Sequence, residues 1–209
     1  MSVLDKLAGA LGRNDERPNV ELAEALVAKP DKQAIAELAA ALGAGTMSQQ
    51  NDAIKVLYEI GERKPELVAP HAEAFLALLK SKNNRNVWGA LSAIDTIAAV
   101  RAKDVAARLK DILAAADNGS VIAKDKAMST LAKLALAGDP RAQPALLDRL
   151  ETAALNQFPM YAELAFPAVT PPHKARFKAI LDARLVTIDA PAKRARVEKV
   201  LRRLLKTSQ

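Results

Sequence analysis

The sequence contains no cysteine and few aromatic residues. Among its 209 residues, Phe, Trp and Tyr together make up 3%. The missing thiols exclude disulfides, thiolate nucleophiles and cysteine metal sites. No segment alternates β-branched or aromatic residues with polar ones between turn residues, as half-buried strands do. The composition therefore predicts an all-α protein.

Long apolar runs are also missing. No run reaches the roughly 18 residues that are needed to span a bilayer. The first residues, MSVLDKLAGALGRNDERPN, lack the basic segment followed by an apolar segment that is typical of a signal peptide. We therefore expect a cytoplasmic location and no membrane partner.

The chain is rich in alanine. Alanine accounts for 44 of the 209 residues, and apolar residues for 50%. Alanine and leucine have the highest helix propensities, and small side chains let neighbouring helices approach closely. Proline, glycine and capping residues divide the sequence into short helices without a long linker. We expect a single domain, with an N-terminal helical cap over residues 1–45, a repeat array over 47–186 and a basic C-terminal cap helix over 190–207.

Aliphatic residues recur at a fixed interval. In the first helix of successive pairs the interval is 37 residues, which aligns Leu57, Ile94 and Leu131, and likewise Ile60, Ile97 and Leu134. In the second helices, Leu79 and Leu113 are 34 residues apart, and Leu113 and Leu150 are again 37 apart, as insertions in the turns would produce. Such a period is typical of stacked helix pairs, each of which buries its apolar face only against the next pair.

One copy of the repeat carries a recognisable motif. The stretch LAKLALAGDPRAQPALLDRL, residues 131–150, places Gly138 at the end of one helix, followed by Asp139-Pro140, before a second helix begins. Glycine can take the left-handed conformation of a helix C-cap, aspartate accepts bonds from the next free amides, and proline stops the first helix. The segments 53–79, 87–116 and 158–185 are looser copies, the last with Pro167 inside its first helix.

This motif resembles the HEAT-like repeat of bacterial phycobilisome-lyase-type proteins and other scaffold proteins. The resemblance covers about residues 50–186. It implies an all-α, right-handed α-α superhelix, a HEAT-like or armadillo-like solenoid of about four helix pairs with helical caps. It implies no particular activity, because one scaffold can carry many functions.

Positive charge gathers at the C-terminal end. The whole chain has a net charge of +7, whereas residues 170–209 contain eleven Lys or Arg against three Asp or Glu. Two interpretations are open: a solvated helix face, or a binding site for an anionic partner. The candidate anion-binding residues, many of them on the polar side of the last helix, are Lys174, Arg176, Arg194, Arg196, Lys199, Arg202, Arg203 and Lys206.

No catalytic or cofactor motif stands out. There is no phosphate-binding glycine loop, and the histidines, His71 and His173, each stand beside a proline at an expected helix start, where an exposed or capping role fits better than metal binding. We predict no metal, no cofactor and no catalytic residue. The polar segment from Leu79 to Gly89 is interpreted as a loop between repeats, or alternatively as a contact loop.

Two functions from different classes remain. The first is a non-enzymatic protein-interaction scaffold, whose protein partner lies on the ridge of second helices and can extend to the basic C-terminal cap. The alternative is DNA binding or DNA processing, similar to the HEAT-like alkylpurine DNA glycosylases. These enzymes use Trp, Asp and Arg near the lesion, and this sequence has Trp88, Asp95 and Arg85. We expect Trp88 to pack between repeats and Asp95 to be a solvated or capping residue.

Overall fold

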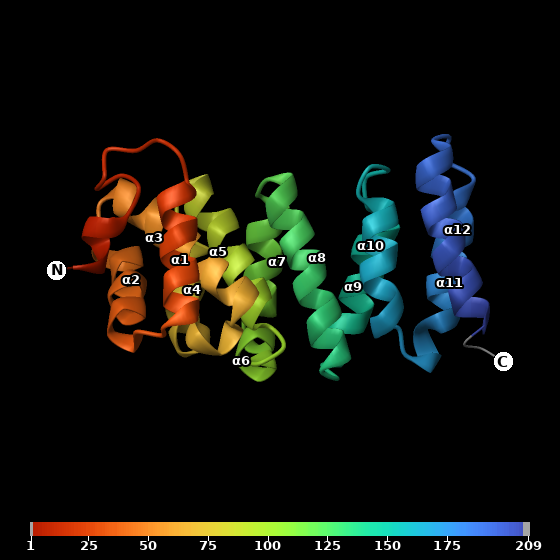
Figure 1. Ribbon diagram of the computed structural model, residues 1–209. Coiled ribbons are helices and arrows are strands. Elements are labelled where there is room, and N and C mark those ends of the chain that lie inside the picture. Colours follow the sequence, from red (N-terminus) through yellow and green to blue (C-terminus); the bar gives the residue numbers. More distant parts are fainter. Residues whose placement is uncertain (1, 207–209) are drawn as a thin grey trace. The chain divides into compact units, whose positions relative to one another are not determined.

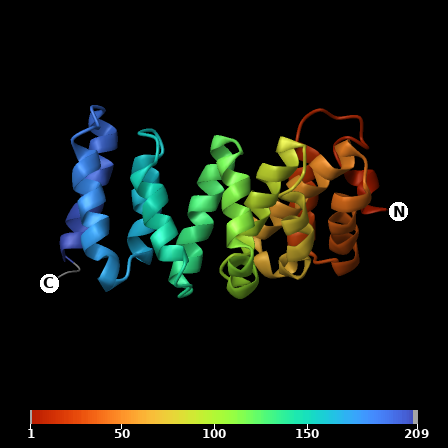
Figure 2. The same ribbon diagram turned by 180° about the vertical axis from the view of Figure 1, so that it is seen from behind.

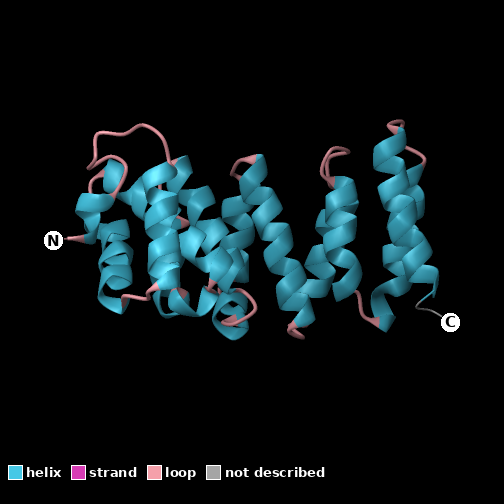
Figure 3. Cartoon of the chain, viewed as in Figure 1, coloured by secondary structure: helices cyan, strands magenta, loops and turns pink. Residues whose placement is uncertain are grey.

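The chain folds into helices connected by short turns. The structure is a computed structural model that describes residues 2–206, and within this range it contains helices and no strand (Figure 3). The predicted all-α class is therefore confirmed. No helix in the described range has the length and apolar character that crossing a bilayer requires.

The chain divides into two compact units, residues 1–127 and 128–209. The division falls within helix α8 (Val121–Leu136). The predicted single domain with its cap and array boundaries stays a prediction.

The first unit is a stack of short helices (Figure 1). It contains the 3-10 helices η1 (Val3–Lys6), η2 (Pro65–Leu67) and η3 (Ala69–His71), together with the beginning of α8. Its other helices are α1 (Arg17–Ala28), α2 (Lys32–Ala44), α3 (Met47–Arg63), α4 (Ala72–Leu78), α5 (Asn84–Ile97), α6 (Ala102–Ala107) and α7 (Leu109–Asp117).

Side-chain caps fix where these helices begin. The Asp31 carboxylate accepts bonds from the amides of Gln33 and Ala34 and is the N-cap of α2. Thr46 is the N-cap of α3. Thr46 and Gln49 exchange side-chain bonds with each other's backbone amides, which satisfies two otherwise free donors.

Helix α3 is the centre of the first unit. It packs against α1 and α2 on one side and against α5 on the other. The approach to α5 is close enough to require glycine at position 89, where a Cβ atom would lie 2.9 Å from Cγ1 of Ile54. Helix α2 also contacts α4, so α1 and α2 pack on α3 and α4.

The predicted 37-residue seam is buried throughout. Leu57 on α3, Ile94 on α5 and Leu131 on α8 are each fully inaccessible to solvent, as are Ile60, Ile97 and Leu134. Residues that are three apart lie on the same side of a helix, so each first helix presents two of these side chains to the core. The expected burial of the seam is confirmed.

The predicted register of the second helices is wrong at Leu113. Leu113 is only half-buried, and the core position is taken by Ile112, which is fully buried together with Ala116. The short helix α6 causes the shift. The helix is interrupted at Arg108, and the buried side of α7 is therefore set by different residues than in an uninterrupted helix. Leu109, Ile112 and Ala116 then form the buried stripe of α7.

Ion pairs join α1, α3 and α5 across their polar side. Glu59 on α3 accepts bonds from Nζ of Lys55 at 2.6 Å and from Nη1 of Arg63 at 2.5 Å. Glu16, which precedes α1, pairs with Lys55 at 3.2 Å and with Arg85 on α5 at 2.5 Å. Burial raises the pKa of Glu59, but the bonds from Lys55 and Arg63 outweigh it, and the pKa lies below its usual value.

The second unit contains the rest of α8, α9 (Ala142–Glu151), α10 (Phe158–Ala165), η4 (Phe166–Ala168), η5 (Pro171–His173), α11 (Lys174–Leu185) and α12 (Pro191–Lys206) (Figure 2). The turn between α8 and α9 follows the predicted motif. Gly138 has a φ of 85°, in the left-handed region, and the Asp139 carboxylate accepts a bond from the Arg141 amide at 2.9 Å.

One detail of the second unit differs from expectation. Pro167 does not lie inside the first helix of its pair, because α10 ends at Ala165 and Pro167 lies in the following 3-10 helix η4.

The buried stripe of α12 consists of Val197, Val200 and Leu204, whereas Leu205 is 48% exposed. Leu205 stands one residue beyond the buried stripe, and a step of about 100° turns it toward solvent.

The seam can be tested with the same substitution at two places on α8. Leu131→Asp places an unpaired charge in a fully buried position, and we expect a loss of at least about 3 kcal/mol of unfolding free energy and about 10 °C in Tm. Leu136→Asp is the control, because Leu136 is 60% exposed. Equal melting temperatures for the two variants would contradict the packing of α8.

The Glu59 network predicts a pH-dependent loss of stability. Because folding lowers the pKa of Glu59, its contribution is present above the unfolded pKa of about 4.3 and disappears as pH falls through the folded pKa. We expect Glu59→Gln to cost about 1 kcal/mol at pH 7 and progressively less as the pH is lowered from about 4.3 through the folded pKa. Urea unfolding over a series of pH values measures this, with Glu66→Gln at an exposed position as control. A cost that does not change as the pH is lowered would rule out the ion pairs as its source.

Candidate functional site

The candidate anion-binding residues all lie on two helices of the second unit. Lys174 and Arg176 are on α11, and the other six are on α12. Residues 128–209 contain fourteen Lys or Arg against seven Asp or Glu, whereas residues 1–127 contain equal numbers of each. The net charge of the chain is therefore carried by the second unit.

Half of these cations are already paired with carboxylates. Arg176 donates from Nη2 to Asp148 at 2.7 Å and to Glu151 at 2.8 Å, and these two acids raise its pKa. Arg196 holds Glu163 of α10 with two bonds, of 2.8 Å and 2.6 Å. The bonds from Arg196 also lower the pKa of Glu163. These two arginines hold helices together and offer little free charge.

Arg194 and Arg202 share one acid on their own helix. Glu198 accepts from Nε of Arg194 at 3.2 Å and lies 3.9 Å from Nη1 of Arg202. Each pair spans one helical turn and is exposed to solvent, so each adds only a few tenths of a kcal/mol. Their charge is still partly offset locally.

Three exposed cations on α12 remain outside these pairs. Lys199, Arg203 and Lys206 have no carboxylate within ion-pair distance among residues 2–206. The Arg203 guanidinium lies over the Phe166 ring, with Cζ 4.5 Å from the ring centre. Lys174 is half-buried and interacts with its surroundings. The structure thus separates the candidate residues by their partners, which their spacing alone does not reveal.

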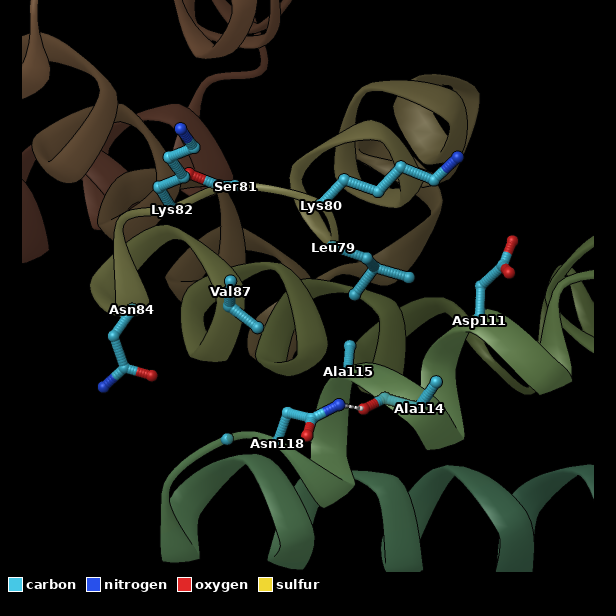
Figure 4. Close-up of a pocket in the computed structure, with 11 residues that line it drawn as sticks. Leu79, Lys80, Ser81, Lys82, Asn84, Val87, Asp111, Ala114, Ala115 and Asn118 are labelled. Carbon is cyan, nitrogen blue, oxygen red and sulfur yellow. Dashed lines mark hydrogen bonds between the residues drawn. The ribbon is translucent and has the colours of Figure 1, made fainter.

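A groove opens on the second helices of the first unit (Figure 4). It has a volume of about 440 Å³ and lies between the end of α4, the beginning of α5 and the end of α7. We call it the α4–α7 groove. Leu79, Val87 and Ala115 converge at its centre and form an apolar floor.

Polar groups surround this floor. Lys80 and Lys82 stand on the turn between α4 and α5, and their side chains extend in opposite directions. Asn118 donates to the Ala114 carbonyl oxygen at 3.0 Å and leaves its own Oδ1 at the rim. Asp111 is engaged by Nε of Arg108 at 2.8 Å, which lowers its pKa. The free charge beside the floor is therefore positive.

The segment from Leu79 to Gly89 is mostly not a loop. Its asparagines favour a loop interpretation, but α5 begins at Asn84 because Asn83 is its N-cap and accepts a bond from the Arg85 amide at 3.0 Å. The remaining turn lines the α4–α7 groove. Sequence reasoning did not find the groove, because α7 supplies its other wall from residues about thirty positions away.

The residues that would suggest a DNA glycosylase do not form an open site. Trp88 packs against Tyr58 with ring centres 6.1 Å apart, which confirms its place between first helices. Asp95 is only 6% exposed, so its expected solvation is wrong. Arg85 pairs with Glu16 and is ten residues from Asp95, about 15 Å along the helix.

The histidines do not cap their helices. His71 and His173 are half-buried and precede α4 and α11, but neither side chain bonds the following amides. Burial lowers the pKa of His71. Across the described range, no three metal-ligating side chains are grouped closely enough to hold an ion.

Comparison with known proteins identifies the fold. No family model and no curated protein matches the chain. A designed armadillo repeat protein, solved in complex with the peptide (KR)4, is 16% identical, with a TM-score of 0.63 over 96% of this chain and 99% of that one. An archaeal HEAT-like repeats protein from Thermococcus onnurineus NA1 is 17% identical, with a TM-score of 0.53 over 92% and 97%. An engineered protein is 19% identical, with a TM-score of 0.64 over 98% and 99%. The predicted HEAT-like or armadillo-like fold is confirmed.

The pair of Arg196 and Glu163 predicts a measurable coupling between α12 and α10. Arg196→Glu sets two carboxylates against each other, and we expect a loss of about 0.5–1 kcal/mol of unfolding free energy, since both side chains are partly exposed. The exchange Arg196→Glu with Glu163→Arg should recover most of it. Urea denaturation of the four proteins measures the coupling, and additive effects would show that the ion pair does not stabilise the packing.

Proposed function

We propose that this protein is a non-enzymatic interaction scaffold whose protein partner binds along its second helices. The α4–α7 groove is the observation that supports the proposal. It lies between second helices of successive pairs, α4 and α7, with the beginning of α5 beside them, and we expect the partner on the second helices. The stacking of the two helix pairs forms its walls.

The chemistry of the groove suits a segment of protein chain. An apolar floor beside polar groups and unpaired cations is typical of sites that bury one aliphatic anchor and fix its orientation at the rim. Leu79, Val87 and Ala115 would contact the anchor. Asn118 and Asn84 offer amide groups for the partner's backbone, and Lys80 and Lys82 favour acidic residues beside the anchor.

Structural neighbours lend general support. One neighbour is a designed armadillo repeat protein that binds the peptide (KR)4. That peptide is basic, whereas the free charge beside the α4–α7 groove is positive. The likeness therefore supports peptide binding as a use of this fold, and we propose a different charge preference here.

DNA binding is the alternative function. The net charge of +7 over residues 128–209 favours it, since phosphate contacts supply much of the affinity for DNA. Against it, Arg176 and Arg196 are held by acids in the same unit. Retention on duplex DNA that falls steeply with salt would support this alternative.

Filling the groove tests the proposal. Peptides are selected from a displayed library on the wild-type protein, and their affinities are then measured for Ala115→Tyr, which places a ring over the floor. Ala40→Tyr on the exposed side of α2 is the matched control. We expect affinity to fall about tenfold or more for Ala115→Tyr and to stay unchanged for the control.

The selected sequences carry a second test. They should share one aliphatic residue next to Asp or Glu. If the selection enriches nothing, or if its peptides bind Ala115→Tyr as tightly as the wild type, the groove is not the binding surface.

A further inference from the structure

The cations on α12 differ in how they are partnered. Arg196 forms an ion pair with Glu163, and Arg194 and Arg202 are close to Glu198. Lys199, Arg203 and Lys206 have no such carboxylate among residues 2–206, and all three are exposed. The remaining acid on this side, Glu163, lies near Lys199 but holds Arg196 with both of its oxygens.

We propose that Lys199, Arg203 and Lys206 form a binding strip for an acidic segment of a partner protein. These residues stand at i, i+4 and i+7 on one helix. A step of 100° and a rise of 1.5 Å per residue place them within an arc of about 60° and a length of about 10 Å. A second helix with carboxylates at the same spacing can face all three. The strip is independent of the α4–α7 groove, so the two proposals can fail separately.

Phe166 orients Arg203, the middle residue of the strip. The Arg203 guanidinium rests over the ring at 4.5 Å, a cation–π contact between α12 and η4. This contact restricts a side chain that would otherwise lose much freedom when it binds. Because the Phe166 ring contacts only the face of the Arg203 guanidinium, the N–H groups at its edge can still donate to two carboxylate oxygens.

The dimensions favour a protein segment over a nucleic acid. Proteins that bind duplex DNA through its backbone make about six to ten phosphate contacts. A strip of about 10 Å with three cations reaches only two or three phosphates on one strand. Single strands also need exposed aromatic faces for base stacking, and Arg203 already lies over the Phe166 ring.

The test uses a fluorescent helical peptide with Glu at i, i+4 and i+7, and a second peptide with Gln at the same places. Fluorescence anisotropy at low salt gives both affinities for the full chain. Lys199→Gln with Arg203→Gln removes two charges from the strip. Lys193→Gln with Arg194→Gln removes the same charge from other sides of α12, at about 120° and 140° from Lys199. We expect about a tenfold loss for the first variant and less than about twofold for the second.

Phe166→Leu separates preorganisation from charge. It keeps every cation and, with helicity and Tm checked, is expected to weaken the Glu peptide by about threefold. Three results would overturn the proposal. The first is equal affinity for the Glu and Gln peptides, and the second is equal loss in the two paired-charge variants. The third is tighter binding of a duplex DNA than of the Glu peptide at the same salt concentration, which would assign the strip to nucleic acid.

Discussion

Burial of the aliphatic seam is the constraint on which the rest of the structure depends. Leu57, Ile94 and Leu131 each lie on a short helix that is only marginally stable alone. Each helix hides its apolar stripe only when the next helix pair covers it. Burial of the seam brings α5 close to α3, and this is why position 89 is a glycine. The α4–α7 groove also depends on stacking, because its walls belong to successive helix pairs.

Ion pairs hold neighbouring helices together in the second unit. Arg176 and Arg196 contact Asp148, Glu151 and Glu163 in this way. These pairs leave the net charge of the unit unchanged, but they determine which of its cations stay exposed without a carboxylate partner. The two proposals rest on three exposed cations of α12 and on the α4–α7 groove, and both concern a defined segment of a partner rather than general attraction to polyanions.

The sequence predicted the fold class and the first-helix register, because a period of 37 residues and the Gly138-Asp139-Pro140 turn are local signals. The prediction that Leu113 takes the core position was wrong, because the residue spacing does not indicate that the helix is interrupted between α6 and α7. The eight candidate cations lie on α11 and α12, and their binding of an anionic partner stays a prediction. Which cations stay free depends on acids about thirty residues away, such as Glu163 for Arg196, and the groove joins three helices. Contacts of this kind have no signature in local sequence.

Native-state hydrogen exchange followed by mass spectrometry tests the seam most directly. If stacking across the aliphatic seam holds the fold together, the amides around Leu57, Ile94 and Leu131 should exchange most slowly. Exchange around Leu57 and Ile94, which lie in the same unit, should accelerate together as denaturant is added, because one opening exposes both. The contrary result is exchange around the three seam residues that is as fast as in the exposed turn at Lys80–Lys82. Such a result would show that stacking across the seam does not stabilise these helices.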